Sequence, residues 1–243
     1  MSTASTIDSL NPYLSPTATI DSDHPAVAEY AQRALQGTSG GAVEKAVRLY
    51  YAVRDGIWYD PYQPFYKPEH YRASRVLEQG RAFCIGKAGL LCALGRACGI
   101  PSRLAFADVR NHLATRQLIE FMGTDIFVFH GVTEFLLEGK WVKATPAFNL
   151  QLCRRHGVEP LEFNGREDSL FQSFNTHGRR FMEYVKERGS FQDIPVEEIV
   201  KAWRESYGTE RVDQWIAMFE AAGGKPVRDF GAEDPLTPRP CAG

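Results

Sequence analysis

Two residues of the chain have the chemistry of a nucleophile and its base, Cys84 and His130. Cys84 opens a helical pattern within 81–101, RAFCIGKAGLLCALGRACGIP, where leucines and alanines recur at helix spacing. Gly99 and Pro101 end this pattern. A thiol at a helix N-terminus meets unpaired N–H groups and the positive end of the helix dipole. We therefore expect the pKa of Cys84 to fall below the ordinary value of about 8.5, as in a cysteine nucleophile.

The alternative for Cys84 is a packing role, because cysteine is among the most buried residue types. Cys92 and Cys98 lie within the same helical pattern and are expected to pack in the core. The chain has five cysteines and no Cys-x-x-Cys pair, which argues against a disulfide framework and against a zinc site of the usual spacing. We expect no metal, no cofactor and a cytoplasmic location, where a free thiol stays reduced.

A β-hairpin is expected to position His130. Its parts are a β-rich run at 125–137, the turn signal Glu138-Gly139 and a returning strand at 140–145. With a two-residue loop, Leu137 faces Lys140, and counting back places His130 opposite Ala147.

Three polar residues are candidates to orient the imidazole of His130. In this register Thr145 and Asn149 are its diagonal neighbours on one face of the sheet. An expected strand at 102–109, paired antiparallel with the long strand, would bring Asp108 near as well. A cysteine at a helix start, a histidine on a sheet and a polar orienter form the layout of Cys–His nucleophilic catalysis. In that chemistry the histidine takes the proton of the thiol.

Several motifs, taken in chain order, resemble the core of the transglutaminase-like superfamily. They are VRDGIWYDPY at 53–62, Cys84 at a helix start, Gly99-Ile100-Pro101-Ser102-Arg103, His130 opening a strand, Gly139-Lys140-Trp141-Val142, and Pro146. That superfamily includes tissue transglutaminases, peptide N-glycanases and many bacterial cysteine hydrolases. The resemblance covers residues 20–150 and implies a papain-like α+β fold in which Cys, His and Asp come in that order. It implies that Cys84 is the nucleophile and His130 the base.

One position departs from the superfamily's pattern. Where the pattern reads W-x-x-x-D-P, this chain has Trp141 to Pro146 with Thr145 in place of the aspartate. A threonine hydroxyl accepts a hydrogen bond from an imidazole N–H but brings no charge. Three alternatives are open at this point. Thr145 orients the imidazole of His130 more weakly than an aspartate would, Asn149 or Asp108 takes over this role, or the site is degenerate.

Other polar groups are weaker candidates for the site. An oxyanion hole needs donors aimed at a developing charge, and the backbone N–H of Cys84 is the natural first one. Gln79 is a candidate second donor. His112 lies in a polar connection, of the kind that can line a cleft. The sequence shows no calcium-binding run of carboxylates, which makes a calcium-activated cross-linking enzyme a weaker reading.

The expected fold class is α+β, with one domain of transglutaminase-like fold at residues 1–230. Its core, at about 20–150, has N-terminal helices and a central Cys-bearing helix packed on an antiparallel sheet. A C-terminal helical extension follows at 151–230, with helices expected at 171–188, 195–207 and 212–222. The Pro-rich polar stretch 231–243 is expected to be a disordered tail.

The expected function is thiol-dependent hydrolysis or acyl transfer, with Cys84 attacking an amide, ester or thioester of a peptide or small molecule. The alternatives are a non-catalytic binding or scaffold module of the same fold, and a specialised biosynthetic enzyme using the same cysteine. A net charge of −2 gives no indication of nucleic-acid binding. The sequence predicts no secretory signal and no bilayer-spanning run, hence no membrane partner, and it gives no indication of oligomeric state.

Overall fold

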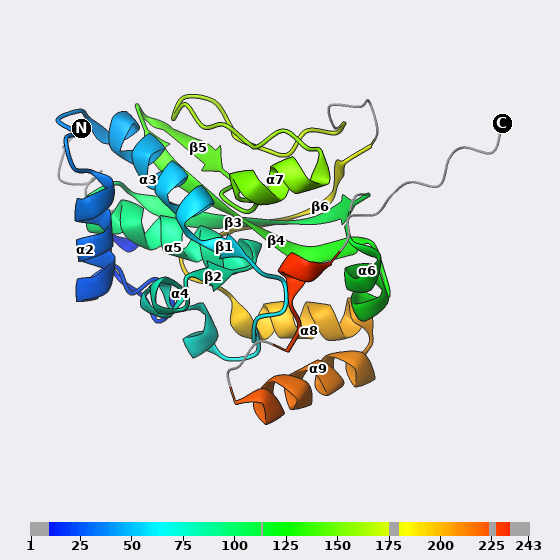
Figure 1. Ribbon diagram of the computed structural model, residues 1–243. Helices are drawn as coiled ribbons and strands as arrows, with labels where there is room; N and C mark the ends of the chain where they lie inside the picture. The colour runs from blue at the N-terminus through cyan, green and yellow to red at the C-terminus, as the bar shows by residue number, and fades with distance from the viewer. Residues whose placement is uncertain (1–9, 113, 175–179, 224–226, 234–243) are drawn as a thin grey trace.

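The fold is built around a helix that begins at Cys84 and a four-stranded antiparallel sheet (Figure 1). The computed structural model describes residues 10–112, 114–174, 180–223 and 227–233. The helices are α2 (Pro25–Ala34), α3 (Ala42–Gly56), α4 (Ala73–Gln79), α5 (Cys84–Ala97), α6 (Arg116–Met122), α7 (Leu150–His156), α8 (Val196–Tyr207) and α9 (Thr209–Ala222), with short 3-10 turns η1 (Asn11–Tyr13), η2 (Pro68–Tyr71) and η3 (Phe230–Ala232). The strands are β1 (Trp58–Tyr59), β2 (Arg81–Ala82), β3 (Ser102–Asn111), β4 (Ile126–Leu137), β5 (Lys140–Ala144) and β6 (Met182–Phe191).

Helix α5 is the central element, as the sequence predicts. Nearly all of its side chains are buried, and it packs against β3 and β4 on one side and against α2, α3 and α4 on the other. Because the helix is apolar on all sides except at Lys87 and Arg96, it is stable only inside the molecule. Its last turn ends at Gly99, whose φ of +74° is the left-handed conformation that a glycine adopts at little cost.

The main sheet has the order β5-β4-β3-β6. The predicted hairpin is confirmed: Leu137 pairs with Lys140, and both loop residues, Glu138 and Gly139, have positive φ. The β4–β5 ladder ends at the pair of Thr133 with Ala144, so the expected pairing of His130 with Ala147 is wrong. The chain leaves the sheet at the end of β5 before it reaches that position.

The helix predicted at 171–188 is wrong, because this part of the chain contains strand β6. Strand β6 pairs antiparallel with β3, from Leu104 opposite Phe191 to Asn111 opposite Met182. Apolar residues such as Tyr184 and Val185 match a helical spacing, but they are partly exposed on an edge strand rich in charged residues. The pairing that decides the structure is made with a strand about eighty residues away in the chain.

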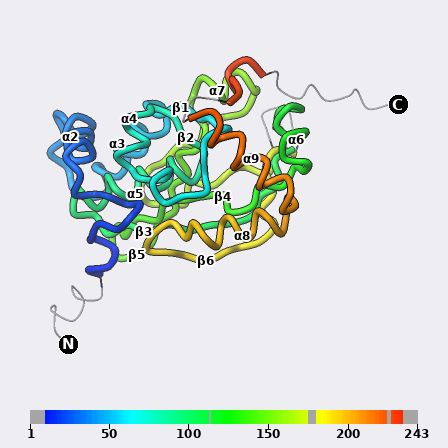
Figure 2. Tube along the Cα trace, turned by 90° about the horizontal axis from the view of Figure 1, so that it is seen from below, coloured from blue at the N-terminus to red at the C-terminus, as the bar shows by residue number. Residues whose placement is uncertain are grey.

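The helices that follow β5 lie on both sides of the sheet (Figure 1). Figure 1 shows α8 and α9 below the sheet and α7 above it, and Figure 2 views the same arrangement from below. Helix α8 packs on β4 and on α9. The bounds of α8 and α9 are close to the two helices predicted from the sequence at 195–207 and 212–222. Because the C-terminal part shares the sheet and the hydrophobic core with the rest of the chain, we propose that the chain forms one domain.

The start of the expected tail is ordered. Residues 230–232 form η3, and the buried carboxylate of Glu233 accepts hydrogen bonds from the hydroxyls of Tyr62 and Thr115. A disordered tail from residue 231 is therefore wrong for 231–233, while 234–243 lie outside the described residues. No helix in the described ranges has the length and apolarity needed to cross a membrane.

Candidate active site

Cys84 is the first residue of α5 and lies almost inside the protein, with 9% of its surface exposed. The preceding residue, Phe83, has extended backbone and provides no side-chain cap. The free N–H groups of the first turn are therefore directed at whatever lies at this helix end. The backbone N–H groups of Gly131, Ile85 and Cys84 itself favour the thiolate and act to lower the pKa of Cys84.

The expected lowering of the Cys84 pKa is not found. Burial raises this pKa from 9.0 to about 11, and the three N–H groups oppose that effect without overcoming it. The sequence indicated the helix terminus but not the apolar surroundings that exclude water from the thiol. Cys84 is therefore a protonated thiol at neutral pH.

His130 is brought to Cys84 by the glycine that follows it. A Cβ atom at Gly131 would lie 2.9 Å from the Cα of Ile85 and 3.4 Å from the carbonyl oxygen of Cys84. Strand β4 therefore touches the first turn of α5 at a point where no side chain fits. Cys84 and His130 line the same cavity, which has a volume of about 580 Å³ including its mouth.

The imidazole of His130 is buried and neutral. Only 4% of the residue is exposed, and its ring centre lies 5.2 Å from that of Phe171. Burial lowers the pKa of His130 from 6.5 to about 4. Its Nε2 has no hydrogen-bond partner within the described part of the chain. His130 is therefore neutral at pH 7, the protonation state from which a general base accepts a proton, and it lines the same cavity as the thiol of Cys84.

The backbone just before His130 is held in an uncommon conformation. Phe129 has a φ of +63°, in the left-handed region that bulky residues rarely adopt. Its N–H donates to Oδ1 of Asp108 at 3.1 Å, and both oxygens of Asp108 accept from Arg188 at 2.9 and 2.8 Å. The guanidinium carbon of Arg188 lies 4.9 Å from the centre of the Phe129 ring. Asp108 and Arg188 therefore fix the bend from which His130 projects.

Thr145 and Asn149 are both buried just after β5. The carbonyl of Thr145 accepts from the Tyr50 hydroxyl at 3.2 Å, and Oδ1 of Asn149 accepts from the N–H of Tyr59 at 3.3 Å. The hydroxyl oxygen of Thr145 and Nδ2 of Asn149 have no hydrogen-bond partner among the described residues. Like Nε2 of His130, they are buried polar atoms whose bonding is incomplete, and a partner or a buried water normally satisfies such atoms.

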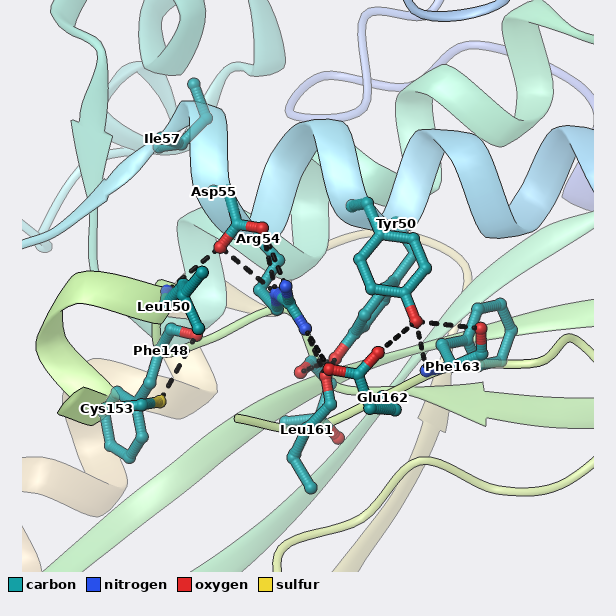
Figure 3. A network of polar contacts seen from close by, with 12 residues as sticks. Tyr50, Arg54, Asp55, Ile57, Phe148, Leu150, Cys153, Leu161, Glu162 and Phe163 are labelled. Carbon is teal, nitrogen blue, oxygen red and sulfur yellow. Dashed lines mark hydrogen bonds and ion pairs between the residues drawn. The ribbon is translucent and has the colours of Figure 1, made fainter. Parts of the chain in front are cut away.

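A polar network at the end of α3 anchors this segment (Figure 3). Arg54 donates to the carbonyl of Leu161 at 2.8 Å and pairs with Asp55 at 2.7 Å. Oδ1 of Asp55 in turn accepts from the N–H of Leu150 at 2.9 Å. Because Leu150 follows Asn149 directly, this network fixes the chain that carries the candidate orienters to the helix that precedes β1.

Neither of the two weaker sequence candidates lines the cavity. His112 lies 3.5 Å from a carboxylate oxygen of Glu183, and Gln79 ends α4. Gln63 does line the cavity, and its side-chain N–H donates to Oδ2 of Asp60 at 2.7 Å. Sequence reasoning missed Gln63 because it lies in an irregular segment with no periodic pattern.

Helices α8 and α9 also contribute to the cavity. Trp203 and Tyr207 of α8 and Trp215 and Phe219 of α9 lie in its wall. The periodicity of their apolar residues predicted the two helices, but it did not predict that they pack over the cavity that Cys84 and His130 line. In the described ranges, no group of three or more His, Cys, Asp or Glu side chains is arranged to hold a metal ion.

Comparisons with known proteins address the fold. No curated protein sequence matches the chain. A candidate cysteine protease from Cytophaga hutchinsonii is 15% identical with a TM-score of 0.48, over 79% of this chain and 50% of that protein. A candidate protease from Parabacteroides distasonis is 20% identical with a TM-score of 0.35, over 53% of this chain and 26% of that protein. The chain thus spans half or less of the length of each.

The sequence profile of the transglutaminase-like superfamily matches residues 28–146. This range contains Cys84, His130 and Thr145, together with α5 and the hairpin of β4 and β5. The mixed architecture, with a Cys-bearing helix on an antiparallel sheet, is the one that the resemblance implied. Through this core, the chain is similar to the transglutaminase-like superfamily.

Proposed function

We propose that the chain is a thiol-dependent hydrolase or acyltransferase that acts on an amide, ester or thioester through an acyl-enzyme on Cys84. The observation that carries this proposal is that Cys84, at the N-terminus of α5, and His130 line one cavity. We also propose a cytoplasmic location, because a free nucleophilic thiol persists in a reducing compartment.

In the first step the neutral pair becomes charged as the substrate reacts. The Sγ–H proton of Cys84 passes to His130 while Sγ bonds to the carbonyl carbon of the substrate. The carbon–leaving-group bond then breaks, and the leaving amine, alcohol or thiol takes the proton from His130. This leaves a thioester on Cys84 and a neutral imidazole.

The second step returns the enzyme to its starting state. A water molecule or an acceptor amine or alcohol gives its proton to His130 and attacks the thioester carbon. The bond from carbon to Sγ breaks, and Cys84 recovers its proton from the imidazole. Water gives hydrolysis, and another acceptor gives transfer.

The oxyanion that forms in both steps needs two donors. We assign the backbone N–H of Cys84 and the side-chain amide of Gln63, in place of Gln79. Asp60 holds one N–H of Gln63 and leaves the other for the carbonyl oxygen of a substrate in the cavity. Removal of one such donor typically lowers kcat by about 10²–10³-fold, which Gln63→Met tests.

Thr145 is our first candidate for the group that orients His130. Its hydroxyl is buried and unpaired among the described residues, as is Nε2 of His130. Asn149 is the second candidate, since its Oδ1 is already bonded to Tyr59. The carboxylate of Asp108 is engaged by Arg188 and Phe129, so it acts on the backbone before His130.

The test is turnover of p-nitrophenyl acetate and of an acetyl thioester, with the acyl-enzyme trapped and located by peptide mass spectrometry. We expect an acetyl group on Cys84, no turnover above background in Cys84→Ala, and a loss of about 10²–10⁴-fold in His130→Ala. Hydroxylamine as acceptor distinguishes transfer, which yields a hydroxamate, from hydrolysis.

Cys98→Ala is the matched control, because Cys98 follows the last residue of the same helix and lies away from the cavity. It should retain full activity. Equal turnover in Cys84→Ala and the parent protein would contradict the proposal and favour a non-catalytic module. A non-catalytic module would not need a charged residue to orient His130, which would explain the uncharged Thr145 at this position.

A further inference from the structure

We propose that the cavity beside Cys84 binds the acyl part of the substrate, and that this part is an uncharged hydrocarbon group, aromatic or aliphatic. This inference rests on the proposed function and adds the substrate class. The cavity is continuous with the nucleophile and the base, because Cys84 and His130 form part of its wall. A group bonded to the carbonyl that Cys84 attacks therefore projects into it.

Apart from Gln63 and the two tyrosines, Tyr59 and Tyr207, the remaining walls are apolar and mostly aromatic. They come from Leu118, Phe121 and Met122 of α6, Trp203 of α8, and Trp215 and Phe219 of α9. The rings also pack on one another: Phe121 stacks on Trp215 with centres 4.7 Å apart. Such walls favour hydrocarbon, since each methylene removed from water stabilises binding by a similar increment.

The polar groups of two wall residues already have partners. The indole N–H of Trp203 donates to the carbonyl of Val128 at 2.9 Å. The hydroxyl of Tyr207 accepts from the N–H of the same residue at 2.7 Å. These two bonds fasten α8 to the strand that carries His130 and leave no polar group of the indole for a ligand.

No Asp, Glu, Lys or Arg is among the described residues that line the cavity. A carboxylate or ammonium on the acyl group would lose its water without gaining a partner, which is costly in apolar surroundings. The same surroundings keep His130 and Cys84 neutral. The walls therefore select against charged acyl groups and favour hydrocarbon ones.

The first test compares p-nitrophenyl esters that share one leaving group and differ in the acyl part: acetyl, butyryl, hexanoyl, benzoyl and succinyl. We expect Cys84-dependent kcat/KM to rise by about threefold per methylene from acetyl to hexanoyl. The succinyl ester, which carries a carboxylate, should react at least about tenfold more slowly than the butyryl ester of the same chain length. A flat series, or a succinyl ester as good as butyryl, overturns the inference while leaving the proposed function intact.

A binding measurement tests whether the cavity takes an uncharged hydrocarbon group even if the protein turns over none of these esters. Trp203 and Trp215 lie in the cavity wall, and Trp58 and Trp141, the other tryptophans of the chain, do not. In Trp58→Phe/Trp141→Phe/Cys84→Ala protein, 6-bromohexanamide should quench the remaining fluorescence saturably, and succinamate should not. Quenching without turnover in the parent protein supports the pocket and contradicts the proposed function. Absence of quenching overturns the inference.

Two methionines give a matched pair of variants. Met122 lines the cavity, whereas Met218 of α9 is partly buried outside it. Met122→Lys places an ammonium in the wall and should lower the butyryl-to-succinyl preference at least about tenfold, and Met218→Lys should leave it unchanged. If the lysine variant does not fold, Met122→Phe fills the space instead and should move the best chain length towards acetyl. An unchanged preference in a folded Met122→Lys protein overturns the inference.

Discussion

The ionisation state of Cys84 gives the sharpest test of the site. With a pKa of about 11, raised by burial, the thiol is ionised at pH 7 to about 1 part in 10⁴. An ordinary thiol with a pKa of about 8.5 is ionised to about 3%. The thiolate population of Cys84 is thus smaller by about 300-fold, whereas each thiolate is about tenfold more nucleophilic because it is more basic. Labelling of Cys84 at pH 7 should therefore be about 30-fold slower than that of a free thiol.

The assay is the rate of iodoacetamide labelling, followed by mass spectrometry of the peptide that contains Cys84 between pH 5 and 10. The same peptide labelled in urea supplies the matched reference, because unfolding removes the burial of the thiol together with the N–H groups around it. In the folded protein the rate should rise about tenfold per pH unit without levelling off up to pH 10. His130→Ala should change this profile little, since a neutral imidazole does not stabilise a thiolate.

A different profile would refute this reasoning. Labelling that levels off below pH 7, and loses the plateau in His130→Ala, is the signature of a thiolate–imidazolium pair. The pH dependence of turnover gives a second reading of the same question. Because the pKa of His130 is lowered by burial to about 4, kcat/KM should fall only as the pH approaches 4, and not near 6.5.

Three further predictions concern the groups that hold the pair together. Gly131→Ala places a Cβ 2.9 Å from the backbone of Ile85, so it should lower the free energy of unfolding by about 2 kcal/mol in urea titrations and reduce kcat more than it raises KM. Asp108→Ala removes the partner of Arg188 and should lower the free energy of unfolding by about 3 kcal/mol, whereas Asp108→Asn should retain more stability and activity. Burial lowers the pKa of Lys87 from 10.5 to about 7, so between these values the unfolded chain binds more protons than the folded one. The free energy of unfolding should therefore rise by about 2–3 kcal/mol more between pH 7 and pH 9 in the parent protein than in Lys87→Met. Equal dependence of the free energy of unfolding on pH in the two proteins would contradict this prediction.

The elements that local pattern specifies were predictable from the sequence. Helix α5 has an apolar pattern with a glycine stop, and the β4–β5 hairpin has a two-residue turn that sets its register. Cys84 could be selected because it begins α5, whereas His130, which was expected to open a strand, lies within β4, whose first residue is Ile126. Their meeting depends on Gly131, whose missing side chain lets β4 touch α5.

The features that long-range contacts decide were not predictable. Strand β6 forms because β3 has a free edge, and its own sequence also fits a helix. The burial of Cys84 is set in part by Trp203 and Tyr207, more than one hundred residues further along the chain. The sign of the Cys84 pKa shift follows from that burial, so a prediction from the helix terminus alone was wrong.

The neutral states of Cys84 and His130 and the uncharged threonine at position 145 are consistent with one another electrostatically. Position 145 is buried, so a carboxylate there would need a cation beside it to offset the loss of water. In the superfamily's pattern, with an aspartate at this position, that cation would be the imidazolium of the histidine. A threonine hydroxyl can orient an imidazole without favouring its charged form. Charge then develops only during the attack, when the proton of Cys84 passes to His130 and the carbonyl oxygen becomes negative. The walls that keep this pair neutral also reject charged acyl groups, so the substrate preference and the pH dependence should change together when a charge is placed at Met122.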